Sequence, residues 1–433
     1  MAALVFVVFL VMLALSVPIA VSMIYSTLIP LMAGAPGASN IQTLIQNTFS
    51  GADSTPIIAI PLFIIGGVLM SEGGISERLF NVFAYFVGRR RAGMPIAVIM
   101  TCLFYGAISG SGPATTAAVG GMTIPLLIEL GYDKRFCAAM VAVAGGLGVI
   151  IPPSIPFVLY SLATGVSTGS LFMAGVLPGI FIGICLMVYA YIYCTIHGEN
   201  KEKILAHDAK LRANGFWPLF KESFWAFLSP LIILGGIYTG IVTPTEAACI
   251  SIFYALFVSL VIYKSVKPKD LWGFIGSAVR TYAPLCFLLA YATAFGRMLA
   301  LIDAPAMFSA FILTYFKSQW SVLLIIVVMF YFLGMVMDTG PAILIMAPIL
   351  LPLVQQVGVN PVHFGVIMVT NLAIGLSTPP FGLDLFVASG LIKDKPLAVS
   401  LPAWPFIIAF TFALLVIVYV PQLSLSLLSL MGL

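Results

Sequence analysis

The chain has 433 residues, of which 61% are hydrophobic and 8% are charged, and its formal net charge at pH 7 is +4. Soluble globular proteins carry about 25% charged residues, so this composition excludes an ordinary soluble protein, and we expect no nucleic-acid partner. Several apolar runs reach or approach the roughly 20 residues that cross a bilayer as a helix. The sequence therefore predicts an all-α polytopic membrane protein embedded in a lipid bilayer.

The N-terminal apolar run, residues 4–32, has neither a basic start nor a small-residue cleavage site. It is therefore predicted to be a retained helix and not a signal peptide. With the loop that follows, it forms an expected N-terminal scaffold segment, residues 1–54. The six cysteines stand singly in apolar segments, and the three histidines lie at segment ends or in a loop. We expect neither a disulfide framework nor a histidine metal site.

Residues 105–179 and 332–406 resemble each other in the order of their glycines and prolines. The matching positions are separated by 228, 227 and 227 residues, and they are Gly112-Pro113 with Gly340-Pro341, Gly131 with Gly358, and Pro152-Pro153 with Pro379-Pro380. Such a constant spacing predicts two internal repeats, residues 55–196 and 265–421. Scaffold helices are expected over 223–264, and a C-terminal tail over 422–433.

In each repeat a Gly-Pro break divides an apolar run into two short halves, and a Pro-Pro break divides the next helix. Short, Gly/Pro-interrupted segments in matching positions of two halves indicate the binding site of a secondary transporter. Unwound backbone is tolerated at membrane depth only where it is buried in protein or lines a polar cavity. We therefore expect re-entrant helical hairpins near 92–131 and 319–358, with Pro-broken helices near 151–154 and 377–380.

The basic residues predict the orientation. Tracing the helices places 17 of the 19 Lys and Arg residues on one face, leaving Arg297 and Lys317. Basic loops face the cytoplasm, so the first hairpin is expected to enter from inside and the second from outside, which makes the repeats inverted. The N-terminus is then cytoplasmic, the segment 197–222 is a cytoplasmic linker, and the C-terminus is periplasmic. Residues 76–91 are interpreted as an interfacial arm helix, with the end of a spanning helix as the alternative.

Hydroxyls and unwound carbonyls gather at the predicted breaks. Oxygen ligands of this kind suit a hard cation such as Na⁺ without any carboxylate, and one cluster in each repeat predicts two coupled cations. The alternative is that the hydroxyls only bond helix backbone. The residues concerned are Ser109, Ser111 and Thr115 with the break 148–154 in the first repeat, and Thr339, Gly340, Thr370, Asn371, Ser377 and Thr378 in the second.

Three charges stand deep in apolar segments: Arg297, Asp338 and Asp384. The planar fork of an arginine suits a carboxylate, so Arg297 is a candidate anion ligand, with snorkelling to the membrane surface as its alternative. Asp338 stands at the second tip, where it would orient Arg297 or bind the hydroxyls of a substrate. Half-helix N-termini at both tips would add positive partial charge.

An enzyme is not expected, because the sequence contains neither the paired aspartates of an intramembrane protease nor a nucleophile elbow with His and Asp partners. An ion channel is a weaker alternative, because selectivity filters are built as symmetric rings, whereas the two hairpins differ.

The stretches GAISGSGPATTAAVGGMTIP, LGYDKRFCAAMVAVAGGLGVIIPPSIPFVLY and DTGPAILIMAPILLPLVQQVGVNPVHFGVIMVTNLAIGLSTPPFGLDLFV resemble the large membrane subunit of TRAP (tripartite ATP-independent periplasmic) transporters. The resemblance spans nearly the whole chain and implies an elevator-type carrier with scaffold and transport domains in the bacterial inner membrane. It implies sodium-driven uptake of an organic acid, closest to the sialic acid branch, although C4-dicarboxylate carriers share the motifs. A stand-alone sodium/carboxylate symporter of related inverted-repeat fold is the alternative.

The same resemblance implies two partners, a small four-helix membrane subunit and a periplasmic substrate-binding protein. It also implies site residues, with two or more sodium ions. The first sodium site would use Ser109, Gly112, Gly148, Ile151 and Pro153. The second sodium site would use Gly340, Thr370, Ser377 and Thr378. The substrate would be bound by Ser111, Ser154, Arg297 and Asp338.

Overall fold

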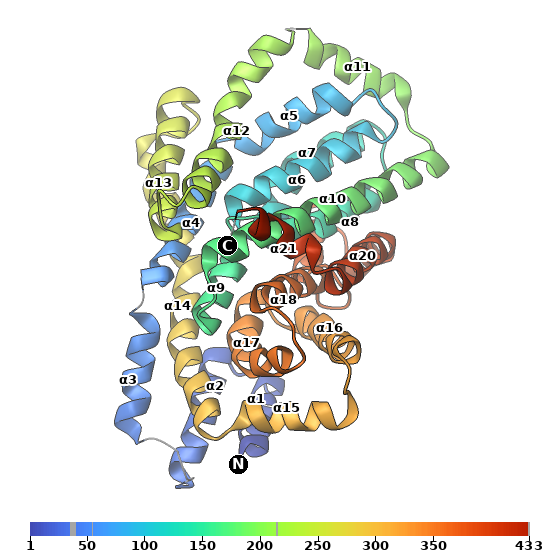
Figure 1. Cartoon of the computed structure of the whole chain (residues 1–433). Coiled ribbons are helices and arrows are strands. Elements are labelled where there is room, and N and C mark those ends of the chain that lie inside the picture. Colours follow the sequence, from blue (N-terminus) through green and yellow to red (C-terminus); the bar gives the residue numbers. More distant parts are fainter. Residues whose placement is uncertain (35–39, 54, 214, 432–433) are drawn as a thin grey trace.

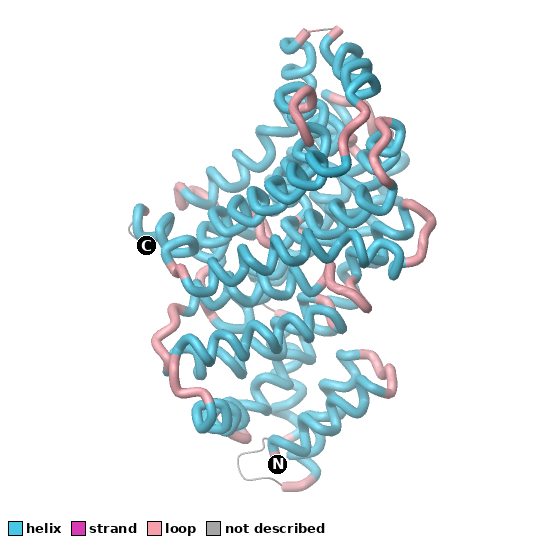
Figure 2. Tube along the Cα trace, turned by 90° about the vertical axis from the view of Figure 1, so that its right-hand side faces the viewer, coloured by secondary structure: helices cyan, strands magenta, loops and turns pink. Residues whose placement is uncertain are grey.

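The computed structural model describes residues 1–34, 40–53, 55–213 and 215–431. Of the residues that the structure describes, 83% are helical and none forms a strand (Figure 2). Within that part, seven helices are long and apolar enough to cross a membrane, or eight if the bent pair Ile41–Ala52 and Ile57–Glu72 counts as one span. The predicted all-α polytopic class is confirmed.

The N-terminal apolar run is not one helix. It forms α1 (Ala2–Ala14) and α2 (Ile19–Met32), which pack against each other. Pro18 disfavours helical backbone in the residue before it, and Ser16 has a φ of +61°. The expected single helix is therefore wrong.

Two series of seven helices occupy the two repeats. The first consists of α4 (Thr55–Glu72), α5 (Ile75–Val87), α6 (Gly93–Ser109), α7 (Gly112–Glu129), α8 (Lys134–Gly145), α9 (Ile155–Thr164) and α10 (Thr168–His197). The second consists of α14 (Leu271–Leu301), α15 (Ala304–Tyr315), α16 (Gln319–Val336), α17 (Thr339–Gln356), α18 (Pro361–Gly375), α19 (Leu383–Leu391) and α20 (Pro396–Tyr419). Each predicted hairpin range contains two helices that pack against each other, α6 with α7 and α16 with α17.

The remaining helices lie before, between and after the two series. They are α3 (Ile41–Ala52), which packs along α14 (Figure 1), α11 (Lys201–Arg212), α12 (Phe216–Tyr238), α13 (Pro244–Phe257) with a π-helical extension Val258–Ile262, and α21 (Gln422–Leu430). The predicted linker is thus shorter than expected, because its apolar end already belongs to α12. The predicted tail is a helix that packs against α10. The boundary at residue 54, residue 214 of the linker and residues 432–433 of the tail lie outside the described residues.

The broken helices lie at the centre of the molecule. Residues 136–145 of α8 and 363–375 of α18 are all buried. The break that follows α8 contacts α18, because a Cβ atom on Gly146 would lie 3.2 Å from the carbonyl oxygen of Ala373, 227 residues further on. The breaks are therefore surrounded by protein, as unwound backbone at membrane depth requires.

Several basic segments are tied together at one end of the molecule. Asp208 of α11 pairs with Arg89, just before the first hairpin, and with Arg212 at 2.8 Å. Asp394 pairs with Lys134 at 3.3 Å and Arg135 at 3.0 Å, just after that hairpin. Both ends of the first hairpin therefore lie beside the linker and the loop before α20.

The predicted arm helix is α5, a separate 13-residue helix that follows the break at Gly73-Gly74. It is too short to span a bilayer, and it packs against α6 and α12. The alternative interpretation, the end of a spanning helix, is not supported. Its place at the membrane surface stays a prediction.

Candidate functional site

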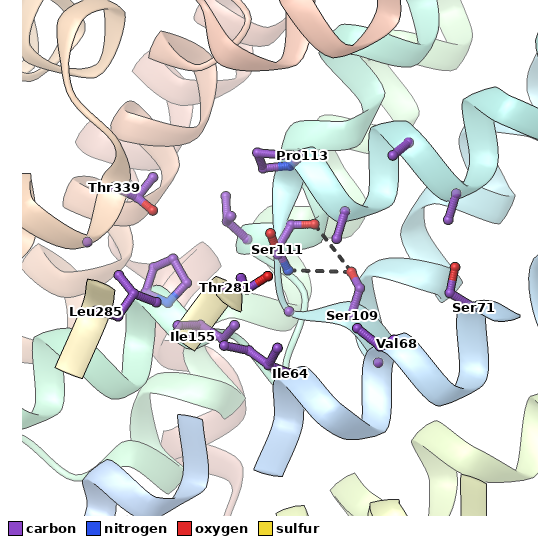
Figure 3. A pocket seen from close by; sticks show the side chains of 18 of the residues that line it. Ile64, Val68, Ser71, Ser109, Ser111, Pro113, Ile155, Thr281, Leu285 and Thr339 are labelled. Atoms are coloured by element: carbon purple, nitrogen blue, oxygen red, sulfur yellow. Dashed lines mark hydrogen bonds between the residues drawn. The ribbon is translucent and has the colours of Figure 1, made fainter. Parts of the chain in front are cut away.

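The two hairpin tips line one cavity of about 450 Å³. This volume falls within the range of small-molecule sites, roughly 300–1,000 Å³. The walls come from both repeats and include Ser109, Ser111 and Pro113 of the first tip, Thr339 of the second tip, Ile64 and Val68 of α4, Ile155 of α9, and Thr281 and Leu285 of α14 (Figure 3).

The first tip turns sharply because Gly110 adopts a φ of +62°, which a glycine reaches without steric cost. Gly110 ends α6, and α7 starts two residues later with Ser111 as its N-cap and Pro113 in its first turn. Proline suits that position because the first N–H groups of a helix have no partner within it. The Gly-Pro signal therefore produces two helices that meet at a tight corner.

Three oxygens cluster at this corner. The Ser109 and Thr115 hydroxyls lie 2.7 Å apart, and both contact the carbonyl of Ser111, with Oγ–O distances of 3.3 and 2.9 Å. Gly148 of the following break lies against them, since a Cβ there would lie 2.3 Å from Thr115 Oγ1 and 2.7 Å from the Ser111 carbonyl. Ser109, Gly148 and the start of α7 at Gly112 are thus brought together.

Other residues predicted for the first repeat have different surroundings. Pro153 presents its carbonyl to the tip, 2.7 Å from where a Cβ on Gly110 would stand. Ser154 is buried and does not line the cavity. Its hydroxyl donates to the Val149 carbonyl at 2.5 Å, and its oxygen caps α9 by accepting a hydrogen bond from the Phe157 amide at 3.3 Å. The side chain of Ile151 packs against Gly179 of α10.

The second tip carries an acid. Asp338 is the N-cap of α17, and its carboxylate accepts a hydrogen bond from the Thr339 amide at 2.7 Å. Asp338, Thr339 and Gly340 all line the cavity. A Cβ on Gly340 would face Leu159 of α9 at 3.4 Å and Leu285 at 3.6 Å.

The polar residues of the second break are buried behind the tip and do not line the cavity. Ser377 donates to the carbonyl of Ala142 on α8 at 3.0 Å, and Thr378 donates to Ile374 at 2.7 Å. The Thr370 hydroxyl has no partner within the described part of the chain. The hydroxyls predicted for the second sodium site therefore do not contact one another as Ser109 and Thr115 do in the first.

Arg297 lies in a different cavity, of about 380 Å³, with Ser50, Thr293 and Pro348 among its lining residues. It stands on α14 twelve residues beyond Leu285, which corresponds to about 18 Å along a helix axis. The expected contact between Asp338 and Arg297 is therefore absent from this structure.

The tip cavity carries negative charge. Glu72 and Asp338 both line it, whereas no Lys, Arg or His is among the described residues of its wall. Positive potential at this place comes from the N-termini of α7 and α17, which end at the two tips. The cavity therefore suits an anion only together with cations that offset the two acids.

A protein-family model, the tripartite ATP-independent periplasmic transporter, DctM component, matches residues 6–423. The chain belongs to this TRAP transporter family. It is thus a large permease subunit and not an enzyme, and it is a multi-pass membrane protein of a bacterial TRAP transporter.

Curated TRAP permeases are similar over most of this chain. The isethionate TRAP transporter permease DctMQ of Oleidesulfovibrio alaskensis is 42% identical over 95% of this chain, which spans 64% of that relative's length. A putative TRAP transporter large permease of Haemophilus influenzae is 37% identical over 89% of both chains. The C4-dicarboxylate TRAP large permease DctM of Rhodobacter capsulatus is 33% identical over 90% of this chain and 91% of its own.

Two solved transporters share the fold of this TRAP subunit. YdaH of Alcanivorax borkumensis aligns with a TM-score of 0.62 at 14% identity, covering 87% of this chain and 86% of its own. MtrF of Neisseria gonorrhoeae aligns with a TM-score of 0.60 at 12% identity, covering 87% and 83%. At these identities the likeness concerns the fold alone.

The sequence interpretation missed part of the TRAP subunit's tip cavity. Ser71 and Glu72 at the end of α4, Tyr105 of α6, and Ser277 and Thr281 of α14 also line it. None of them stands at a Gly-Pro break. Their polar character within apolar helices was the available signal, but the sequence does not indicate which helices surround the tips.

Proposed function

We propose that this TRAP subunit carries out sodium-coupled secondary active uptake of an organic acid, delivered by a periplasmic binding protein, through an elevator movement. The observation that supports it most directly is one cavity bounded by both hairpin tips, with an oxygen cluster at the first. Discontinuous helices meeting near mid-membrane are the arrangement secondary transporters use for substrate and coupling ions.

Sodium is the proposed coupling ion because the first tip offers a compact set of oxygens, and the described residues that line the cavity include no Cys, Met or His. Ser109, Thr115 and the Ser111 carbonyl would supply the first ion, with the unwound carbonyls near Gly148. The second ion would use the backbone at Gly340 and the break that includes Thr378. Two monovalent cations would also offset Glu72 and Asp338, so that an anion can enter.

The substrate is proposed to occupy the tip cavity between Ser111 and Asp338. Its carboxylate would face the N-termini of α7 and α17, where backbone N–H groups and the helix dipole favour an anion. Its hydroxyl groups would suit the Asp338 carboxylate. Ser154 would act through its cap on α9, one residue before the lining residue Ile155.

Arg297 fits this proposal at another stage. The tip cavity meets α14 at residues 277–285, and the Arg297 cavity meets the same helix at residues 289–300. An elevator movement of the tips along α14 would bring them towards Arg297. We therefore propose that Arg297 acts on the substrate carboxylate in the outward-facing state.

The partners proposed are the small four-helix TRAP subunit and the periplasmic binding protein, which are general components of the family. The location proposed is the inner membrane with a cytoplasmic N-terminus, a cytoplasmic segment around α11 and a periplasmic C-terminus. Two ion pairs support a common face for these basic segments: Arg89 before the first hairpin pairs with Asp208 of α11, and Arg135 after it pairs with Asp394.

The proposal is tested by reconstituting the chain with its small subunit in liposomes. Radiolabelled C4-dicarboxylate and sialic acid are offered with and without their binding proteins, under an inward sodium gradient. Uptake that needs both the gradient and a binding protein supports the proposal. Uptake without any binding protein favours a stand-alone symporter, and uptake indifferent to sodium removes the coupling.

A further inference from the structure

Asp384 is a fully buried acid whose carboxylate has no hydrogen-bond partner among the described residues. It lies in the first turn of α19, it is 0% exposed, and neither carboxylate oxygen has a hydrogen-bond partner in the described part of the chain. A buried carboxylate without compensation costs several kcal/mol, roughly. The side chain must therefore be neutral or hold a cation.

The carboxylate faces the start of the first hairpin's second helix. Its two oxygens lie 3.1 and 3.5 Å from the position of a Cβ atom on Gly112, the first residue of α7. Further along, Leu391 of α19 lies 2.8 Å from the corresponding position on Gly120. The two glycines thus let α19 run close along α7, and Asp384 reaches the hairpin one residue beyond the cavity-lining Ser111.

A second unpaired oxygen is carried by α7, close in sequence to Gly112. Thr116 stands one turn after Gly112 on α7, it is fully buried, and its hydroxyl has no hydrogen-bond partner among the described residues. It faces Gly145 of α8, where a Cβ atom would overlap its oxygen at 1.8 Å. Since α19 packs against both α7 and α8, both unpaired side chains belong to the meeting of these three helices.

The charges around the junction offer no counter-ion. Among the described residues no Lys, Arg or His forms an ion pair with Asp384, and none lines the neighbouring tip cavity. The basic residues Lys134 and Arg135 at the start of α8 pair with Asp394. A carboxylate here thus needs a positive charge that the described residues do not provide.

We propose that the Asp384 carboxylate and the Thr116 hydroxyl bind a further sodium ion behind the first tip, separate from the Ser109–Thr115 cluster. A monovalent ion with oxygen ligands neutralises the single buried charge, whereas a divalent ion would leave a positive one. The ion would join α19 of the second repeat to the hairpin of the first. Its role in transport rests on the proposed sodium coupling, but its binding is measurable without transport.

The test measures binding of radioactive sodium to the purified full chain in detergent, with choline chloride holding ionic strength constant. In Asp384→Asn the number of sodium ions bound per chain falls by one. Thr116→Val keeps the side-chain volume and weakens the affinity of one ion by about 5-fold or more. The matched control Asp303→Asn, at an exposed acid in the loop before α15, binds sodium as the wild type does.

An unchanged number of ions and unchanged affinities in Asp384→Asn would overturn the proposal and leave Asp384 a permanently neutral structural acid. If Asp384→Asn is not monodisperse in size-exclusion chromatography, Thr116→Val decides alone, and wild-type sodium binding in that variant overturns the site. Ser109→Ala separates this result from the proposed function, because it weakens the tip site while sparing the ion at Asp384.

Discussion

Gly375 lies so close to Gly334 that a Cβ atom on Gly375 would stand 2.5 Å from the Gly334 Cα. In the other direction a Cβ atom on Gly334 would stand 3.0 Å from the Gly375 Cα, and the equivalent Cβ atom on Gly106 in the first half would stand 2.8 Å from the Gly148 Cα. Each pair brings the first helix of a hairpin against the break of the next helix. Both breaks therefore depend on the absence of a side chain.

Gly375→Ala is expected to lower the stability of the protein by about 1–3 kcal/mol, because the added methyl group would overlap backbone atoms of Gly334. The measurement is thermal unfolding of the detergent-purified chain. The control is Gly390→Ala in α19, where no atom lies within 4 Å of the new Cβ. A Gly375→Ala variant as stable as the control would mean that the two helices separate easily.

Ser109→Ala is expected to raise the sodium concentration that half-saturates uptake by about 5- to 150-fold. The reason is that the loss of one ligand oxygen costs roughly 1–3 kcal/mol of sodium-binding free energy. Thr378→Ala is expected to act in the same direction, although the Thr378 hydroxyl, in the break after α18, also donates to the Ile374 carbonyl in the last turn of α18. Sodium titrations of uptake at equal expression measure both. Unchanged half-saturation in the two variants would make the hydroxyls structural.

Arg297 and Asp338 are expected to respond differently to substitution. Asp338→Asn should impair uptake at every sodium concentration, because Asp338 lines the tip cavity. Arg297→Glu should abolish uptake by repelling the anion in the outward-facing state. Arg297→Lys should retain only part of the wild-type uptake, because an ammonium group lacks the planar fork of a guanidinium. Full uptake by both Arg297→Lys and Arg297→Ala would assign Arg297 to snorkelling.

The orientation is tested with a cysteine at Lys210, an exposed position of α11. In a Cys249→Ser background, which removes the exposed native cysteine, a membrane-impermeant thiol reagent should label this site only after the cells are opened. The reason is the positive-inside distribution of the basic segments. Labelling of cells in which the outer membrane is permeabilised and the inner membrane is intact would place α11 in the periplasm.

Asp208 is expected to stabilise the protein in a pH-dependent way. Burial raises the pKa of Asp208, but hydrogen bonds from Arg212 and Arg89 outweigh burial, and the pKa lies below its ordinary value. The contribution of ionised Asp208 to the free energy of unfolding is therefore fully present at neutral pH. It is lost as the pH falls below the ordinary aspartate pKa of about 3.9 and through the lower pKa of Asp208 in the folded protein.

Asp208→Asn should accordingly reduce thermal stability at pH 7 by about 1–3 kcal/mol, and the difference from the wild type should shrink in acid. Glu202→Gln, at an exposed position of the same helix, serves as the control and should change little. A difference between wild type and Asp208→Asn that stays constant on acidification would mean that the ion pairs do not contribute.

The amino-acid sequence by itself predicted the membrane class, the two hairpin ranges and the helix breaks. It did so because glycine and proline act locally: Gly110 permits a left-handed corner, and Pro113 fits the first turn of a helix and little else. The same local logic failed at residues 4–32, where Pro18 divides an apolar run that hydropathy alone treats as continuous.

The tertiary structure decided which of these residues meet. It joined Ser109, Thr115 and Gly148 at one corner, placed Arg297 and Asp338 in separate cavities, and brought Asp384 of the second half against Gly112 of the first. Such contacts join segments hundreds of residues apart through helix packing, which depends on the shapes of all neighbouring side chains and not on any local signal. Charge and hydropathy indicate that Asp384 is buried in the membrane. Only packing determines that its carboxylate faces the start of α7 and has no hydrogen-bond partner among the described residues.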